Sequence, residues 1–332
     1  MQAKTVIFSQ PDQIKIAEID VPTPGPGQIL TRTVCSGVST GTEIRVLKGG
    51  EESAQFPLIP GYENVGEIIE VGKDVNFKPG TLVYNFGSDF TGQFSRCWGA
   101  HVEYALLSAN NVIEVPSGVN PMDALYTSVG AIALHGIKRG KVAPNDKVAV
   151  VGLGLIGHLA VQCAKAYGAR VIAVDMDKNR LAAAQKAGAE QIVNAAQENV
   201  EQRVKELTNG GVDVAIDVTG IASVVDTTAR LICTQPWQPP YPPNGRVVLL
   251  GSYSEPIQFH YHPTLFENEP DIFPSRYATF DDKKEVMSLI YQQKLQPKLI
   301  PAKVFSFLDA AKAYQELLEQ KLMRVIFSWT SS

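Results

Sequence analysis

The sequence predicts an α/β protein in which a doubly wound parallel sheet is joined to a second, mostly β domain. Three observations support this fold class. Strand-like and helix-like segments alternate from Val148 to Gly251, a glycine-rich turn joins the first of these strands to the first helix, and Gly and Pro interrupt short apolar runs throughout residues 1–125. Such alternation is typical of parallel sheets covered by helices on both faces, whereas the Gly and Pro punctuation is typical of compact β domains.

The elements of the α/β part follow from hydrophobic periodicity. Its strands are apolar on both faces, as burial between two layers of helices requires, and we expect them over Lys147–Val151, Arg170–Val174, Gln191–Val193, Asp213–Asp217 and Arg246–Leu250. Amphipathic segments predict the intervening helices over Leu155–Tyr167, Lys178–Ala187, Asn199–Leu207 and Ser223–Ile232. The C-terminal section predicts helices over Asp281–Gln293 and Leu308–Gln320, and a last strand, Met323–Trp329, that returns to the first domain.

Composition narrows the class of protein and its partners. The chain has 332 residues, 45% of them hydrophobic and 19% charged, which is ordinary for a globular protein. A net charge of −4 without a basic block argues against nucleic acid or an anionic membrane as the main partner. No apolar run approaches the roughly 20 residues that span a bilayer. The N-terminus reads as a strand and not as a signal peptide, and the four cysteines form no C-x-x-C pair, so we expect a cytoplasmic location.

The most informative motif is the G-x-G-x-x-G turn at 152–157, which lies between an expected strand and an expected helix. Gly152 permits the tight turn, Gly154 lets the backbone approach a pyrophosphate, and Gly157 lets the helix pack close to the strand. The backbone N–H groups of the helix start, at Leu155 and Ile156, are available to the phosphates. We therefore predict a Rossmann dinucleotide-binding fold; the alternative is a tight turn without a ligand.

Asp175 indicates which dinucleotide is bound. It ends the second strand about 20 residues beyond the glycines, where a carboxylate can hydrogen-bond the ribose 2′-OH. A 2′-phosphate there would be repelled, so NAD(H) is predicted in preference to NADP(H). Arg180 either stacks on the adenine or is a solvated helix residue. Further cofactor contacts are expected from Val218 and Thr219 after the fourth strand and from Gly251 after the fifth.

The order of motifs along nearly the whole chain resembles the medium-chain dehydrogenase/reductase superfamily, which includes zinc alcohol dehydrogenases and quinone reductases. The resemblance is carried by the segments 24–28, 36–43, 59–67, 71–72, 78–80 and 103–104, the glycine turn, and 217–220. The Ser-Thr-Gly-Thr-Glu and Gly-Tyr-Glu runs look most like the branch that contains bacteriochlorophyllide hydroxyethyl dehydrogenase. The resemblance implies a GroES-like catalytic domain over 1–127 and 273–332, and an NAD-binding Rossmann domain over 128–272.

The chain departs from the zinc members at the positions of their catalytic metal ligands. Thr40 or Ser39, depending on the alignment, stands where the first ligand would be, Tyr62 replaces the histidine of Gly-His-Glu, and the third ligand falls near Val129. Only Glu63 is retained. Catalytic zinc takes about three ligands of His, Cys or carboxylate type, so we predict no metal site and a zinc-independent member.

Without zinc, hydrogen-bond donors must stabilise the developing alkoxide. Tyr62 either donates to the reacting oxygen, in which case Tyr62→Phe should lower kcat by about 10²–10³-fold, or relays a proton if a neighbouring cation lowers its pKa, or fills the vacated metal space. Ser39 or Thr40 either orients the substrate oxygen or bonds local backbone. Glu63 is either a proton acceptor or a structural carboxylate paired with an arginine.

Basic and imidazole side chains supply the remaining candidates. His135, on the helix before the nucleotide-binding domain, is either an acid–base residue or a core histidine. In zinc relatives a histidine near Arg45 touches the nicotinamide ribose, so Arg45 either reaches a cofactor phosphate or is solvated. His101 is a weaker catalytic candidate. His260 and His262 are expected to point the same way from a strand, and no metal is assigned to them.

Together these residues favour a zinc-independent, NAD(H)-dependent oxidoreductase that interconverts a secondary alcohol and a ketone, in a biosynthetic pathway. An enoyl or quinone reductase is the alternative, although such relatives usually prefer NADPH, which Asp175 opposes; a non-catalytic dinucleotide sensor is a third. The partners predicted are a small-molecule substrate and a second copy of the chain, because the stretch from Gly251 to about Arg276 offers a sheet edge for pairing. The proline-rich segment 234–244 reads as a surface loop.

Overall fold

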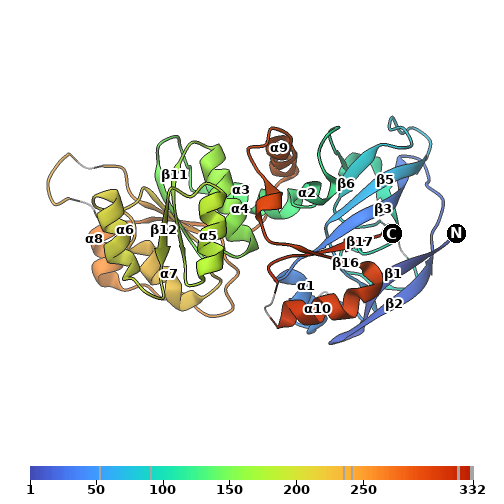
Figure 1. The fold of residues 1–332 in the computed structure, drawn as a ribbon, viewed down its shortest axis with the longest axis horizontal. Coiled ribbons are helices and arrows are strands. Elements are labelled where there is room, and N and C mark those ends of the chain that lie inside the picture. Colours follow the sequence, from blue (N-terminus) through green and yellow to red (C-terminus); the bar gives the residue numbers. More distant parts are fainter. Residues whose placement is uncertain (52–53, 90–91, 235, 241, 320–321, 330–332) are drawn as a thin grey trace. The chain divides into compact units, whose positions relative to one another are not determined.

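The computed structural model describes residues 1–51, 54–89, 92–234, 236–240, 242–319 and 322–329. The chain divides into two compact units, one made of Met1–Ser128 and Ile300–Ser332 and the other of Val129–Leu299 (Figure 1). Packing therefore groups residues 273–299 with the second unit, whereas we expected them with the first. The reason is helix α9 (Phe280–Tyr291), whose Asp282 accepts hydrogen bonds from His135 and Lys138 of α3 (Thr127–Arg139) in the same unit.

The second unit is built on a parallel sheet with strand order β12-β11-β10-β13-β14-β15. The strands are β10 (Lys147–Val151), β11 (Arg170–Asp175), β12 (Gln191–Asn194), β13 (Val214–Asp217), β14 (Arg246–Leu249) and β15 (Asp271–Pro274). Besides α3 and α9, this unit has the helices α4 (Leu155–Ala166), α5 (Lys178–Lys186), α6 (Val200–Thr208), α7 (Ala222–Ala229) and the short α8 (Phe266–Asn268), and helices lie on both sides of the sheet (Figure 1). Because the pairings are parallel, the carboxyl ends of β10, β11 and β13 meet at one edge.

The expected doubly wound sheet is confirmed, and most element ends lie within a residue of expectation. Helix α7 ends at Ala229, short of the expected Ile232, because Ile232 pairs instead with Val212 in an isolated bridge. Strand β15 lies within the stretch from Gly251 to about Arg276 that was expected to offer a sheet edge; it pairs with β14 and forms one edge of the sheet.

The first unit is mostly β, as expected. Two sheets have the orders β2-β1-β4-β7 and β16-β17-β3-β5-β6-β9, with β8 pairing on β3. The strands are β1 (Gln2–Gln10), β2 (Gln13–Asp20), β3 (Gln28–Val38), β4 (Leu58–Ile59), β5 (Asn64–Val71), β6 (Leu82–Asn85), β7 (Ser95–Arg96), β8 (Tyr104–Ser108), β9 (Ile113–Glu114), β16 (Lys303–Ser306) and β17 (Val325–Ser328). The helices are α1 (Thr42–Leu47), α2 (Pro121–Ala124) and α10 (Ala310–Leu318).

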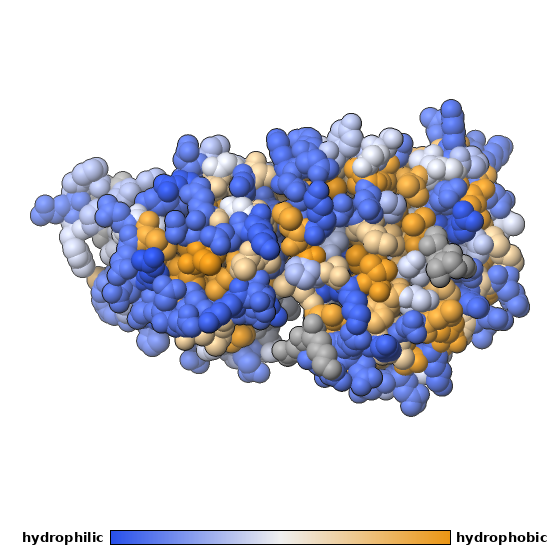
Figure 2. Space-filling view, viewed as in Figure 1, coloured by the Kyte–Doolittle hydropathy of each residue, from blue (hydrophilic) through white to orange (hydrophobic). Residues whose placement is uncertain are grey.

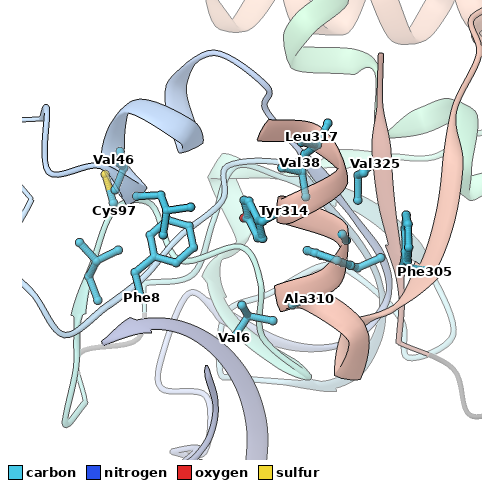
Figure 3. Close-up of a cluster of buried hydrophobic side chains, with 14 of the residues drawn as sticks. Val6, Phe8, Val38, Val46, Cys97, Phe305, Ala310, Tyr314, Leu317 and Val325 are labelled. Atoms are coloured by element: carbon cyan, nitrogen blue, oxygen red, sulfur yellow. The ribbon is translucent and has the colours of Figure 1, made fainter. Parts of the chain in front are cut away.

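The C-terminal strand returns to this unit, as its sequence predicted. β17 runs antiparallel to β3 with Val325 opposite Val38, a register that sets Arg324 beside the end of β3. Helix α10 starts later than expected because Phe307–Asp309 forms a 3-10 turn, and Gln320, the expected helix end, lies outside the described residues. Tyr314 points from α10 into a buried cluster that includes Phe8 and Val38 (Figure 3).

The segment around His260 and His262 differs from expectation, because no strand forms there. The His260 backbone N–H and ring Nδ1 both lie within hydrogen-bond distance of Asp226, at 2.9 and 2.8 Å. The chain then enters a helical turn, Tyr261–Leu265, and the His262 ring packs 4.4 Å from that of Phe266, measured between centroids. The two imidazoles therefore have different partners.

The proline-rich segment contributes an exposed aromatic side chain. Trp237 is 81% exposed and its ring lies 5.9 Å from that of Phe266; Gln235 and Tyr241 lie outside the described residues. Hydrophilic side chains cover most of the face shown in Figure 2, with hydrophobic ones gathered between them. In the part of the chain that the structure describes, no helix is long and apolar enough to cross a membrane.

Candidate functional site

The glycine turn of the second unit has the geometry of an anion-binding site. Gly152 adopts a φ of +93°, and a Cβ on Gly157 would lie 1.9 Å from the Gly152 carbonyl oxygen, so helix α4 can pack this closely only with glycine. A Cβ on Gly154 would meet nothing within 4 Å, so open space adjoins the backbone there. No side chain caps the start of α4, which leaves the N–H groups of its first turn available to a phosphate.

Asp175 lies at the same edge of the sheet as this turn. Its carboxylate accepts the Leu153 N–H at 2.6 Å and the Asp177 N–H at 2.9 Å, which fixes the acid against the glycine turn. Each oxygen retains a further lone pair for a ribose hydroxyl. Asp177 in turn caps α5, the helix that carries Arg180 in its first turn.

Asp217 organises the loop that contains Val218 and Thr219. Its buried carboxylate accepts the Thr219 N–H and hydroxyl at 3.0 and 2.7 Å and the Tyr253 hydroxyl at 2.7 Å. The Gly251 N–H donates to the Asp217 carbonyl at 3.1 Å. The structure thus gathers the cofactor residues expected in this unit at the carboxyl edge of one sheet, where doubly wound folds bind nucleotides.

In the first unit, the side chains of Ser39 and Tyr62 form a hydrogen-bonded hydroxyl pair. The Tyr62 hydroxyl donates to Ser39 Oγ at 2.7 Å, and each residue is only 6% exposed. Among the described residues, no group accepts a hydrogen bond from the Ser39 hydroxyl. Ser39 is therefore the outer donor of the pair, with Tyr62 behind it, whereas Thr40 is part-exposed and its side chain makes no hydrogen bond to this pair among the described residues.

The surroundings of Tyr62 keep its phenol protonated. Burial raises the pKa of Tyr62 well above its ordinary value, and the nearby carboxylates of Glu63 and Glu43 raise it further, while the hydrogen bond to Ser39 opposes them. A phenol in this environment serves as a hydrogen-bond donor at neutral pH and not as a phenolate base.

Glu63 is held by an arginine that the sequence did not identify. Arg324 Nη2 lies 2.6 Å from Glu63 Oε2, both side chains are fully buried, and Arg324 Nη1 donates to the Val38 carbonyl at 2.9 Å. The guanidinium carbon also lies 4.9 Å from the centroid of the Tyr126 ring. Of the two interpretations of Glu63, this geometry supports the paired structural carboxylate. Removing one partner of such a pair costs about 3–5 kcal/mol because a buried charge is left uncompensated.

An aromatic group packs around Tyr62. The ring centroids of Phe86 and Trp98 each lie 5.4 Å from that of Tyr62. Trp98 has a φ of +68°, a conformation that is strained for a bulky residue, and the Ser88 N–H holds its carbonyl at 3.0 Å. Phe86 and Trp98 are both part-exposed, so the hydroxyl pair lies next to flat apolar surface.

Three other side chains proposed from the sequence as site residues form hydrogen bonds or ion pairs with other partners. His135 Nδ1 lies 2.9 Å from Asp282 in the second unit, where the contact anchors α9. Arg45 pairs with Glu51 at 3.0 Å on the surface of the first unit. His101 is fully buried and bonds side chains of its own unit. Within the first unit, Arg45 and His101 make no direct hydrogen bond to the hydroxyl pair among the described residues, and His101 is linked to Ser39 only through Glu43.

The residues present do not fit a catalytic zinc. Ser39 and Tyr62 offer hydroxyls, and Glu63 is held by Arg324. Within the described ranges no group of three or more His, Cys, Asp and Glu side chains is placed to hold a metal ion. Zinc sites use His, Cys and carboxylate ligands, about three of them from the protein when the site is catalytic.

Comparisons with known proteins agree with the two-part architecture. Residues 25–117 match the family model of the alcohol dehydrogenase GroES-like domain, and residues 156–292 match that of the zinc-binding dehydrogenases. The uncharacterized zinc-type alcohol dehydrogenase-like protein YphC of Escherichia coli is 30% identical, over 95% of this chain and 96% of its own length. The sorbitol dehydrogenase of Halalkalibacterium halodurans is 26% identical, over 94% and 95% of the two chains.

A solved structure gives the same fold. The short chain alcohol dehydrogenase from E. coli CFT073, complexed with NADH, superposes with a TM-score of 0.83. The superposition covers 98% of this chain and 99% of that one, at 23% identity.

Proposed function

The chain belongs to the medium-chain dehydrogenase/reductase superfamily, and from this membership we propose that it interconverts a secondary alcohol and a ketone with NAD(H) and without catalytic zinc. The observation that carries the proposal is the Ser39–Tyr62 hydroxyl pair. It occupies the two motifs that supply metal ligands in the zinc members, and it ends in a hydroxyl proton with no acceptor among the described residues.

The second unit fits a nicotinamide dinucleotide. The open backbone at Gly154 and the uncapped start of α4 would receive the pyrophosphate, and Asp175 would bind the adenosine ribose. The bound cofactor supplies or accepts the hydride at the substrate carbon. The Asp175 carboxylate supports NAD(H) over NADP(H), because it would face the extra phosphate with like charge.

The first unit supplies the proton. In the direction of ketone reduction, the Ser39 hydroxyl donates its proton to the carbonyl oxygen as that oxygen becomes an alcohol, and Ser39 takes the Tyr62 proton in exchange. Tyr62 is then reprotonated from water. The raised pKa of Tyr62 means that the pair begins each cycle fully protonated. In alcohol oxidation the same protons move in reverse.

Assembly and setting form part of the same proposal. We place the protein in the cytoplasm, because its cysteines are free thiols scattered over the fold, and in a biosynthetic pathway, because of the branch that its motifs resemble. Strand β15 is an edge of the parallel sheet, which supports a homodimer formed through that edge.

Reduction of an activated carbon–carbon double bond is the second candidate function. Its support is the aromatic surface of Phe86 and Trp98 beside Tyr62, on which a flat conjugated substrate could stack. A conjugated enone separates the two reactions, because carbonyl reduction gives an allylic alcohol and double-bond reduction gives a saturated ketone.

The test is a coenzyme and substrate screen on the purified protein. Ketones, enones and secondary alcohols are each offered with NADH or NADPH, or with NAD⁺ or NADP⁺ for the alcohols, the reaction is followed at the nicotinamide absorbance band, and products are identified by mass spectrometry. The proposal predicts NADH-dependent reduction of ketones to alcohols. A saturated ketone as the main product from enones would favour the second function, and the absence of turnover with every substrate would contradict both.

A further inference from the structure

Glu43 forms a buried hub behind the hydroxyl pair. It lies in α1 and is fully buried. Its Oε1 accepts the Ser39 N–H at 2.8 Å, and its Oε2 accepts His101 Nε2–H at 2.9 Å and the Tyr314 hydroxyl. The backbone completes a reciprocal clasp, because the Glu43 N–H donates to the Ser39 carbonyl at 3.1 Å.

Two of the hydrogen bonds behind this hub have a fixed direction. An indole N–H can only donate and a carboxylate can only accept, so Trp329 Nε1 donates to Ser36 Oγ and His101 Nε2 donates to Glu43, and a hydrogen bond between Ser36 Oγ and His101 Nδ1 joins the two. Each of these three bonds is 2.8 or 2.9 Å long. The acceptor role of Glu43 places an imidazole proton on Nε2.

Serine, histidine and an acid in series also occur in nucleophilic hydrolases. Here Ser36, His101 and Glu43 are each fully buried, so no substrate can approach the serine oxygen. The network therefore has a structural role: through Glu43 it holds the backbone of Ser39 in place.

We propose that Glu43 is the positioning residue of the Ser39–Tyr62 hydroxyl pair, an inference that rests on the proposed function. Ser39 lies in the loop between β3 and α1, and the N-cap of α1, Gly41, has no side chain to cap the helix. The Glu43 clasp binds that loop from both sides. It fixes where the Ser39 Oγ lies, and so keeps it 2.7 Å from the Tyr62 hydroxyl.

The charge of Glu43 acts on the same pair. Its carboxylate is one of the groups that raise the pKa of Tyr62, after burial and Glu63. Replacing the carboxylate with an amide removes that charge and also points an N–H₂ group at surrounding donors. The lost charge and the misplaced amide should both change kcat only through Ser39 and Tyr62. A residue that merely supports the fold would lower kcat whether or not the Ser39 hydroxyl is present.

The experiment is a double-mutant cycle between Glu43→Gln and Ser39→Ala, with kcat for ketone reduction as the readout. Glu43→Gln alone should lower kcat by about tenfold or more, with the Kd for NADH unchanged, because one of the two oxygens that accept from Ser39, His101 and Tyr314 becomes an N–H₂ donor and the hub cannot satisfy all three. In the Ser39→Ala background, the same change should lower kcat less than about twofold, because the hydroxyl it positions is gone. Equal losses in both backgrounds would overturn the proposal.

The matched control is Glu67→Gln, on β5 of the same unit. Glu67 is a surface carboxylate paired with Arg32 at 3.2 Å, so its change should leave kcat within about twofold of wild type. If Glu43→Gln does not fold, Tyr314→Phe replaces it in the cycle. That variant removes one donor to Glu43 and keeps the ring contact with Phe8 at 5.3 Å.

A crystal structure of the same variant gives a readout that needs no turnover. In Glu43→Gln, or in Tyr314→Phe in its place, the Ser39 and Tyr62 hydroxyl oxygens should move beyond hydrogen-bond distance of each other. An unchanged hydroxyl pair would overturn the positioning role. Absence of ketone reduction by the wild-type protein would instead contradict the proposed function, and the geometry would still decide between the two outcomes for Glu43.

Discussion

The substitution Ser39→Ala bears on which hydroxyl touches the substrate. The Tyr62 hydroxyl donates to Ser39 Oγ at 2.7 Å, so the serine keeps a hydroxyl proton for the substrate and the phenol acts through it. Losing a donor to the developing oxyanion typically lowers kcat by about 10²–10³-fold. In Tyr62→Phe, Ser39 would take its proton from water directly, and the lost hydrogen bond one step behind it is worth about 1 kcal/mol, or roughly fivefold. Ser39→Ala should therefore be much more damaging than Tyr62→Phe.

Stability should change alongside activity. Ser39→Ala leaves the buried Tyr62 hydroxyl without its acceptor, which costs about 1–3 kcal/mol of unfolding free energy. Tyr62→Phe removes that hydroxyl while retaining the ring packing, so it should cost less. The assay is steady-state ketone reduction with saturating NADH, with chemical denaturation and the NADH Kd measured on each variant. A larger loss of kcat in Tyr62→Phe than in Ser39→Ala would refute the assigned order of the two hydroxyls.

Three further predictions concern the cofactor, pH and assembly. Asp175→Ser should narrow the preference for NADH over NADPH in a fluorescence titration, since a charge repulsion is removed, and a wild-type preference for NADPH would show that the acid does not select the cofactor. Burial lowers the pKa of His158 to about 4, and neither ring nitrogen has a hydrogen-bond partner among the described residues. The unfolded state binds this proton at higher pH than the folded state, so the free energy of unfolding should fall by about 3 kcal/mol between roughly pH 6.5 and pH 4. His158→Leu should flatten that part of the plot of unfolding free energy against pH, and an unchanged plot would contradict the prediction. Light scattering at micromolar protein should give the mass of a dimer, and a proline in β15 (Asp271–Pro274) that prevents edge pairing should shift it to a monomer.

The features that could be predicted from the sequence are those determined by residues close together in the chain. The turn from β10 into α4 follows from three glycines and two periodicities, all within about ten residues, and the structure has it in place. Asp175 and Asp217 were foreseen at the carboxyl ends of their strands for the same reason. Tyr253, which secures Asp217, could not be foreseen, because its contact depends on how two loops pack.

The first unit was less predictable because its contacts are long-range. Arg324 meets Glu63 across 261 positions, and Tyr314 meets Glu43 across 271, through strand register and helix packing that no local pattern encodes. The one sequence feature that indicated the Glu63 partner was an arginine, Arg324, directly before an apolar strand. The grouping of 273–299 with the second unit also depended on a distant contact, between His135 and Asp282.

The most direct test of zinc independence is turnover measured on metal-free protein. Elemental analysis of the purified protein should show no stoichiometric zinc, and exhaustive chelation should leave NADH-dependent ketone reduction at its original rate, because Ser39 and Tyr62 supply the proton. One tightly bound zinc per chain, with activity lost on its removal and restored by its return, would contradict the role assigned to the hydroxyl pair.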